Sequence, residues 1–195
     1  MKKIVLTIVM FSAVFGFYGC GYNKIQGLDE EVKASWSEIQ NQYQRRYDLV
    51  PNLVNTVKGY AKHEKDVFES VTNARSKVGQ MTISDSLAKD PEKLKQFQKA
   101  QSELGSALTR LLAVAENYPT LKASDNFRNL QAQLEGTENR IAVARMRYIE
   151  SVKEYNKSVR FFPTNLTAKL LLHMSVRPNF ELEDKAVKET PKVNF

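Results

Sequence analysis

Apolar residues recur every three or four positions along most of the chain, and this spacing places them on one face of an α-helix. The first such run extends from Leu28 to about Val78, with Pro51 inside it. Because proline has no backbone N–H and crowds the carbonyl one turn earlier, the run predicts one long helix that is kinked near Pro51. Residues 79–90 hold glycine, serine and aspartate at close intervals, which predicts a loop with a frayed helix.

Two further long helices and a short one are predicted after this loop. Asp90 followed by Pro91 is typical of a helix start, because aspartate caps free backbone N–H groups and proline is tolerated at the first helical position. The apolar spacing then continues until Pro119. A third helix is predicted from a cap at Ser124 or Asp125 to Pro163, and a short one follows over residues 164–171.

Strict alternation of apolar and polar residues, the pattern of a β-strand, occurs nowhere in the chain. Long helices joined by brief connections predict an all-α fold, an elongated antiparallel up-and-down bundle with knobs-into-holes packing. We expect this bundle over residues 28–173. Residues 174–195 are polar and aperiodic, and we assign them to a C-terminal tail whose last 15 or so residues we expect to be loose.

Residues 1–20 have a different character. Lys2 and Lys3 precede an apolar run from Ile4 to Tyr18, which is the layout of a secretory signal peptide and is shorter than the roughly 20 residues that a membrane-spanning helix needs. Cys20 follows directly after Gly19, as in a bacterial lipoprotein signal. We therefore expect a signal peptide over residues 1–19 that is cleaved after Gly19, a lipid on Cys20 and a membrane-proximal tether over residues 20–27. An uncleaved signal anchor is the alternative, and either anchor holds the chain on a membrane outside the cytoplasm.

The composition excludes several chemistries. The net charge of +7 is dispersed rather than gathered in a block, so a nucleic-acid partner is not expected. The single cysteine excludes an intramolecular disulfide and a multi-cysteine metal site. No glycine-rich phosphate loop and no Gly-x-Ser-x-Gly motif occur, and His63 and His173 lie far apart in the sequence. We therefore expect no enzymatic activity and no cofactor.

Five charged residues fall where the helical spacing calls for an apolar side chain or beside such a position: Glu64, Arg75, Glu116, Glu138 and Arg145. Because a buried charge is costly unless it is paired, we expect them to form ion pairs between helices that fix the register of the bundle. The alternative is a carboxylate metal site built from Glu64, Glu116 and Glu138. The Glu-x-x-His motif of di-iron bundles is absent, which favours the register role.

Short strings spread over residues 22–180 carry a resemblance to a known family. They include Trp36-Ser37, Gln42-Tyr43-Gln44-Arg45-Arg46, Leu49-Val50-Pro51-Asn52-Leu53-Val54, Val57-Lys58-Gly59-Tyr60, Glu116-Asn117-Tyr118-Pro119, Thr137-Glu138-Asn139-Arg140-Ile141 and Phe162-Pro163. In this order the strings resemble the LemA family of bacterial membrane-anchored proteins. The resemblance implies an N-terminal anchor and an extracytoplasmic four-helix bundle, with no known activity. It also implies binding to other envelope proteins, including TPM-domain proteins and membrane metalloproteases.

These observations predict an envelope scaffold or adaptor, a lipid-tethered rod whose polar faces bind other proteins. An enzymatic or metal-binding module that uses Glu64, Glu116 and Glu138 is the second hypothesis. Direct action on the bilayer through an exposed apolar helix face is the third.

Overall fold

The computed structural model describes residues 2–81 and 83–180, with side chains from residue 21 onward. Over these residues the chain is helical and has no strand, which confirms the all-α prediction. The elements are α1 (Lys2–Lys58), α2 (Lys65–Gly79), α3 (Asp85–Lys89), α4 (Pro91–Ala115), α5 (Pro119–Lys122), α6 (Asp125–Arg160), α7 (Thr164–Leu166) and the π-helix η1 (Thr167–Leu171).

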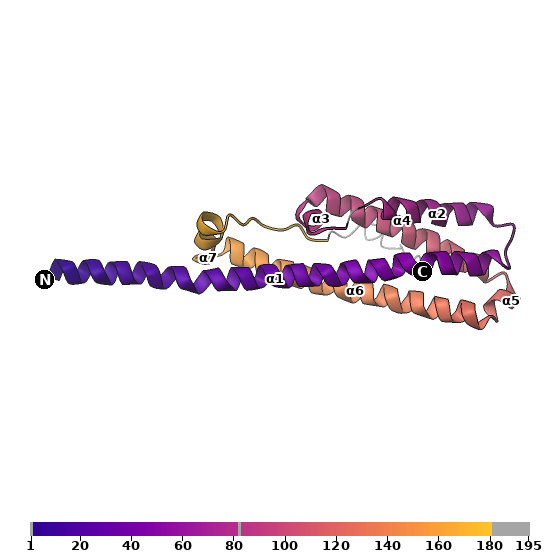
Figure 1. Cartoon of the computed structure of the whole chain (residues 1–195), viewed down its shortest axis with the longest axis horizontal. Helices are drawn as coiled ribbons and strands as arrows, with labels where there is room; N and C mark the ends of the chain where they lie inside the picture. The colour runs from indigo at the N-terminus through magenta and orange to yellow at the C-terminus, as the bar shows by residue number, and fades with distance from the viewer. Residues whose placement is uncertain (1, 82, 181–195) are drawn as a thin grey trace, which may run out of the picture.

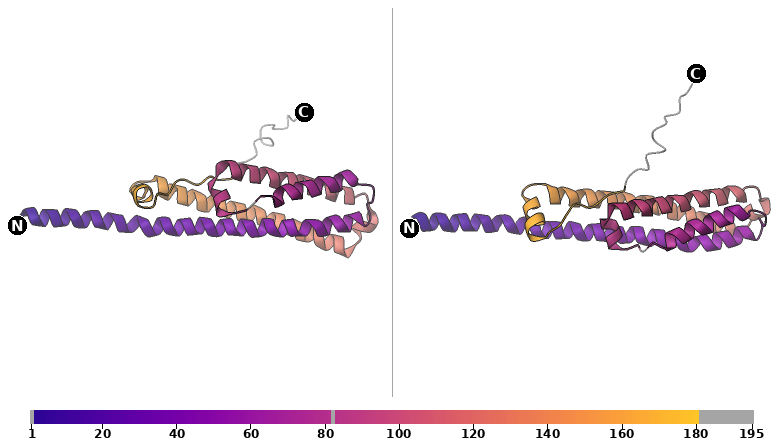
Figure 2. Two further views of the ribbon diagram at one scale, coloured as in Figure 1. Left: turned by 45° about the horizontal axis from the view of Figure 1, so that its top comes forward. Right: turned by 90° about the horizontal axis from the view of Figure 1, so that it is seen from above.

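Four of these helices form an elongated up-and-down bundle (Figure 1). Helix α1 runs the length of the molecule, α2 returns from its far end, α4 runs parallel to α1, and α6 returns beside α1. The most extensive helix–helix interfaces are between α1 and α6 and between α2 and α4, and the two further views show the same arrangement (Figure 2). The N-terminal part of α1 projects beyond the bundle, at the end where α7 lies (Figure 1).

The prediction of a single kinked helix over residues 28–78 is wrong, because two separate helices, α1 and α2, occupy these residues. Helix α1 continues through Pro51 and ends at Lys58, where the Val57 carbonyl accepts hydrogen bonds from the N–H groups of Tyr60 and Ala61 at 3.0 and 2.9 Å. The chain then reverses, and α2 packs back along the bundle. The apolar spacing continues across this reversal because Ala61 and Phe68 enter the same core as the residues before it. Periodicity alone therefore does not reveal the turn.

The start of α4 follows the expected chemistry. Asp90 Oδ1 accepts hydrogen bonds from the N–H groups of Glu92 and Lys93 at 3.0 and 3.2 Å, and Pro91 occupies the first turn. Helix α6 likewise begins at Asp125 after Ser124, as predicted. The loop predicted over residues 79–90 contains the short helix α3, which buries Leu87 and Ala88.

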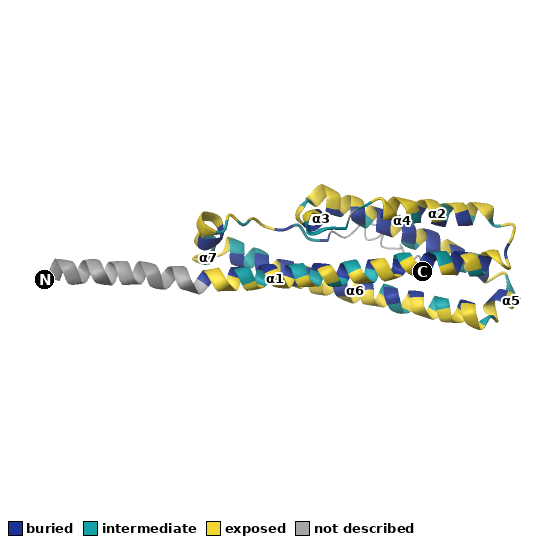
Figure 3. Ribbon diagram, in the orientation of Figure 1, coloured by how far each residue is buried: buried dark blue, intermediate teal, exposed yellow. Residues whose placement is uncertain are grey.

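Buried side chains form two clusters along the rod, and the exposed residues lie on the outer faces of the helices (Figure 3). One cluster surrounds the aliphatic residues of α2 and α4 near the far end. The other surrounds Trp36, whose ring lies 6.0 Å from Phe97 and 5.4 Å from Tyr148 between centroids. The Trp36 indole N–H donates to the Ser84 carbonyl at 3.2 Å, so that its polar group is satisfied inside the core.

Both predicted ends of the bundle require correction. Ile25 is fully buried, so the packed part of α1 begins before residue 28. Residues 174–180, predicted to belong to a polar tail outside the bundle, extend along the bundle and bury Arg177 and Phe180. Two contacts hold these residues against the bundle. Arg177 forms an ion pair with Asp29, and the centroid of the Phe180 ring lies 5.4 Å from that of the Tyr148 ring. Residues 181–195 and the side chains of the predicted signal, including Gly19 and Cys20, lie outside what the structure describes.

Candidate functional site

The five charged residues predicted to fix the register lie at separate places. Glu138 forms an ion pair with Arg46 of α1 at 3.0 Å. Arg75 and Arg145 instead stack on aromatic rings, with the guanidinium carbon 3.8 Å from the centroid of Tyr47 and 4.8 Å from that of Phe180.

The remaining two lie near the far end. Glu64 accepts a hydrogen bond from the Tyr118 hydroxyl at 3.2 Å, and Glu116 is exposed at the end of α4. The expected ion pair between helices therefore forms only at Glu138 among the five, within the described part of the chain.

The structure does not support the alternative of a carboxylate metal site. Over residues 21–81 and 83–180, no three His, Cys, Asp or Glu side chains come close enough together to hold a metal ion. Glu64, Glu116 and Glu138 therefore form no ligand set.

Arg46 lies at the centre of a polar contact that the sequence analysis did not single out. Its guanidinium is buried and donates to both carboxylate oxygens of Glu138, at 3.0 and 3.2 Å. It also donates to the backbone carbonyl of Gln101 at 3.3 Å and to the side-chain oxygen of the same residue. One side chain of α1 therefore connects α4 and α6. A buried ion pair of this kind, in which one guanidinium nitrogen contacts both carboxylate oxygens, favours one register over its neighbours.

A second buried ion pair holds the C-terminal segment. The Arg177 guanidinium donates to Asp29 Oδ1 at 2.6 Å and to Asp85 Oδ1 at 3.3 Å, and its backbone N–H donates to Asn156 Oδ1 at 2.8 Å. The side chains of Arg177 and Asp29 are only 5% and 8% exposed. Burial raises the pKa of Asp29, but hydrogen bonds from Lys33 and Arg177 outweigh it and hold the pKa below its usual value.

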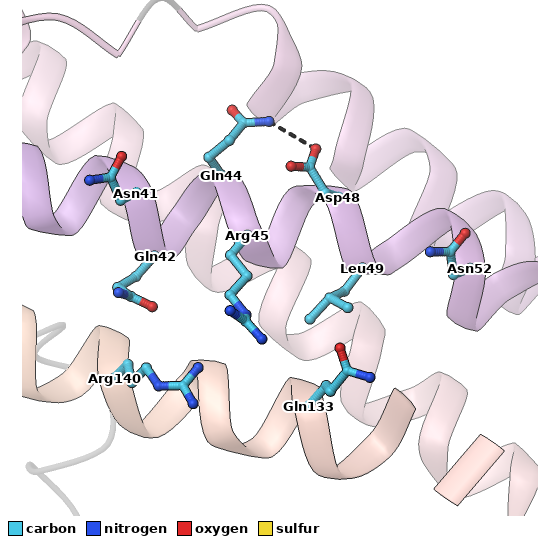
Figure 4. Close-up of a pocket in the computed structure, with 9 residues that line it drawn as sticks. All are labelled: Asn41, Gln42, Gln44, Arg45, Asp48, Leu49, Asn52, Gln133 and Arg140. Carbon is cyan, nitrogen blue, oxygen red and sulfur yellow. Dashed lines mark hydrogen bonds between the residues drawn. The ribbon is translucent and has the colours of Figure 1, made fainter. Parts of the chain in front are cut away.

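An open polar groove of about 640 Å³ lies between α1 and α6 (Figure 4). Its walls carry amide and charged side chains with a single apolar one. They are Asn41, Gln42, Gln44, Arg45, Asp48, Leu49 and Asn52 of α1, with Gln133 and Arg140 of α6. None of these nine is a serine, cysteine, histidine or lysine, so the groove holds no nucleophile–base pair.

The charges of the groove are unbalanced. The carboxylate of Asp48 accepts a hydrogen bond from the Gln44 amide at 2.9 Å, as Figure 4 shows. Arg45 and Arg140 are exposed, and neither has an ion-pair partner in the part of the chain that the structure describes. Gln42 Oε1 is buried without a hydrogen-bond partner among the described residues. Free guanidinium groups bind carboxylates, and free amides can satisfy the backbone of a bound segment.

The helical spacing that places the core residues also explains the groove. Asn41, Arg45, Asp48 and Asn52 follow one another at steps of four, three and four, which is a second stripe on the surface of α1. This stripe could not be recognised from the sequence, because polar residues on an outer face are typical of any solvated helix. The available signal was that Gln42, Arg45 and Arg140 belong to the strings that carry the family resemblance.

The fold defines this chain as an elongated four-helix bundle protein with a projecting N-terminal helix and a basic groove. Comparison with known proteins is consistent with this class, and the chain belongs to the LemA family, whose model matches residues 35–195. Among the residues that the structure describes, no helix has a stretch long and apolar enough to cross a membrane.

Among the curated relatives, magnetosome protein MamQ 2 of Paramagnetospirillum magneticum is 27% identical over 180 residues, which cover 84% of this chain and 65% of the relative. MamQ of Magnetospirillum gryphiswaldense is 27% identical over 75% of this chain and 60% of its own length. Protein LemA of Metamycoplasma hominis is 24% identical over 86% of this chain and 73% of its own. The chain thus spans less than two thirds of the MamQ relatives. Together the family model and these relatives place the chain among the LemA-family proteins.

Proposed function

We propose that this protein is a membrane-tethered scaffold, facing away from the cytoplasm, that binds other envelope proteins through the groove between α1 and α6. The observation that carries the proposal is the pair of guanidinium groups of Arg45 and Arg140 on opposite walls of that groove, neither of which has an ion-pair partner among the described residues. No catalytic step is assigned to it, because its lining side chains offer hydrogen bonds and charge only.

The chemistry of the groove favours an acidic segment of the partner. Each guanidinium presents a planar set of donors that matches a carboxylate in two places. In the same groove, the side chains of Asn41, Gln42 and Gln133 offer amide donors and acceptors for the backbone of a bound chain. TPM-domain proteins and membrane metalloproteases are the partner classes that the family resemblance implies.

The rod suits this role because the groove is built on helices rather than loops. Helices α1 and α6 pack along each other, and Arg46 and Glu138 join them near the groove. A site on rigid elements keeps its geometry between the free and bound states, which lowers the ordering cost of binding.

Tethering is proposed at Cys20, with cleavage after Gly19 and lipid attachment to the cysteine. The order of the segments supports it: a basic start, an apolar run and then the cysteine, immediately before the packed part of α1. A lipid at this position holds the rod by one end.

The groove is tested by photo-crosslinking in native membranes. A photoreactive amino acid at Asn41 is expected to capture an envelope protein through a peptide rich in aspartate and glutamate, identified by mass spectrometry. The double variant Arg45→Glu/Arg140→Glu is expected to abolish the adduct, because it places carboxylates against carboxylates.

Two controls sharpen the experiment. A photoreactive amino acid at Ser106, exposed on α4, is expected to give no such adduct. Arg110→Glu, a charge reversal at another exposed position of α4, is expected to leave the Asn41 adduct unchanged. An adduct that survives the double reversal, or one whose captured peptide is not acidic, would contradict the proposal.

A further inference from the structure

The end of the bundle from which α1 projects carries a group of exposed apolar side chains. We define the apolar cap as Phe161, Phe162, Leu166, Leu170 and Leu171, which follow the end of α6 and lie on α7 and η1. Phe162 is 79% exposed, Phe161 63% and Leu170 60%. So many large apolar side chains in 11 consecutive residues form a patch of the kind that marks an interaction surface.

The cap is held firmly, so its exposure is a property of the folded bundle. Thr167 and Ala168 of η1 are buried on the inner side. The Thr164 hydroxyl donates to the Ser158 carbonyl at 2.6 Å and to the Phe161 carbonyl at 2.9 Å. The inner side of this turn therefore packs on the bundle, while its outer side is apolar and faces outward (Figure 3).

The cap lies against the first packed residue of α1. A Cβ placed on Gly21 would be 3.2 Å from Thr164 Cγ2 and 3.4 Å from Thr167 Oγ1. Cys20, the proposed site of the lipid, directly precedes Gly21 in the sequence. At 1.5 Å per residue, this tether is about 1.5 Å along the helix axis from Gly21. A membrane that holds a lipid on Cys20 would therefore lie at the level of the cap.

Bases outnumber acids around the cap, where Glu154 of α6 pairs with Lys157 and interacts electrostatically with Lys24. No aspartate or glutamate occurs in residues 2–28 or in residues 155–180, the two segments that meet at this end. The same segments bring the exposed bases Lys24, Arg160 and Lys169. Exposed phenylalanine and leucine with an excess of basic residues are the composition that binds the surface of an anionic bilayer.

We propose that the apolar cap inserts into the surface of an anionic lipid bilayer and seats the rod on the membrane by its end. This deepens the proposed function and rests on its N-terminal anchor. The cap would be a second contact, so the rod would stand at a set angle instead of pivoting about one tether. A second copy of the chain is the competing occupant, and the experiment separates the two.

The test uses the full chain in vesicles of phosphatidylglycerol and phosphatidylcholine, with or without brominated acyl chains. Bromine quenches tryptophan only at short range. The one native tryptophan, Trp36, is buried and lies 16 residues after Cys20, about 24 Å along α1, which makes it an unquenched internal reference.

The variant Phe162→Trp is expected to lose emission in brominated vesicles relative to unbrominated ones. Tyr60→Trp, at the exposed turn at the opposite end of the rod, is expected to keep its emission. Flotation of the same samples reports the anchor separately from the cap.

The outcomes divide cleanly. Flotation with quenching of Phe162→Trp alone supports the proposal. Flotation without quenching overturns it and leaves the anchor standing, and a blue-shifted but unquenched emission would assign the cap to a second copy. Failure to float overturns both anchor and cap. Arg45→Glu/Arg140→Glu is expected to leave the quenching unchanged. The proposal for the cap can therefore be tested independently of the proposal for the groove.

Discussion

Pro51 and Arg75 are expected to be energetically coupled, because one exposes a backbone group that the other satisfies. In an uninterrupted helix the carbonyl of Tyr47 would accept a hydrogen bond from the N–H of residue 51, and proline has none. The Arg75 side chain of α2 donates to this carbonyl from Nε at 3.3 Å, and its guanidinium carbon lies 3.8 Å from the centroid of the Tyr47 ring. Helix α1 thus passes through Pro51 with its free carbonyl occupied.

The structure sets the size of the effect. A hydrogen bond from a charged donor contributes about 1.5–3 kcal/mol and a partly exposed cation–π contact about 0.5–1 kcal/mol. Because the hydrogen bond is long, we expect Arg75→Met to lower the free energy of unfolding by about 2 kcal/mol. In a Pro51→Ala background the helix supplies its own donor to the carbonyl. There, Arg75→Met is expected to cost only about 1 kcal/mol, chiefly the lost stacking.

The assay is a double-mutant cycle of the full chain in detergent, with urea unfolding followed by Trp36 fluorescence and far-UV circular dichroism. The expected coupling of about 1 kcal/mol exceeds the 0.3–0.5 kcal/mol within which independent sites add. Pro51→Ala alone is expected to raise stability, because a proline inside a helix is unfavourable. Arg128→Met, which removes an exposed pair within one turn of α6, is the control and should leave unfolding unchanged.

Additive free energies for Pro51→Ala and Arg75→Met would refute this reasoning. That result would mean that the Tyr47 carbonyl is satisfied by solvent and that Arg75 acts through stacking alone. Loss of stability in Pro51→Ala would likewise contradict it, since the proline would then favour the course of α1 that packs against its neighbours.

Three further predictions follow from the buried ion pair and the anchor. Arg177→Met leaves the Asp29 carboxylate buried without its partner and is expected to lower the free energy of unfolding by about 3–5 kcal/mol, measured by urea unfolding. Hydrogen bonds from basic neighbours hold the pKa of Asp29 and Asp85 below the ordinary 3.8 in the folded state, so the stability they add is present above about pH 4 and is lost as pH falls through the folded values. An Asp29→Asn variant should be less stable at pH 7 yet lose less stability between pH 5 and about pH 2. If the dependence of its free energy of unfolding on pH is the same as that of the unsubstituted protein, Asp29 does not contribute to the loss of stability in acid. Cys20→Ser is expected to accumulate unprocessed precursor and to abolish incorporation of labelled fatty acid, and incorporation that persists would exclude Cys20 as the lipid site.

The fold was largely predictable because its evidence is local and repeated. Asp90 and Pro91 mark the start of α4 by capping chemistry that needs no knowledge of the rest of the chain. The turn after Lys58 was not predictable from spacing, since both flanking helices present apolar residues to one core with the same period. Helical periodicity reports which face is buried but not the direction in which the chain runs.

The candidate site was less predictable because it depends on contacts between distant segments. Arg177 lies in a polar, aperiodic stretch, and only the fold brings it to Asp29, 148 residues earlier. Arg46 looks like any charged helix residue until α4 and α6 close over it. The exposed stripe with Arg45 differs from an ordinary solvated face only through Arg140 on the opposite wall, which sequence spacing cannot place.

The unbroken course of α1 sets a fixed distance between the membrane anchor and the groove. With the lipid on Cys20 held at the membrane as proposed, the groove residues 41–52 stand about 30–50 Å above the lipid surface along one helix axis. Partners would then be selected by height as well as by charge. An acidic segment that lies close to the bilayer would be too near the lipid surface to reach the groove. An acidic segment held at the same distance from the membrane as the groove would contact Arg45 and Arg140 directly.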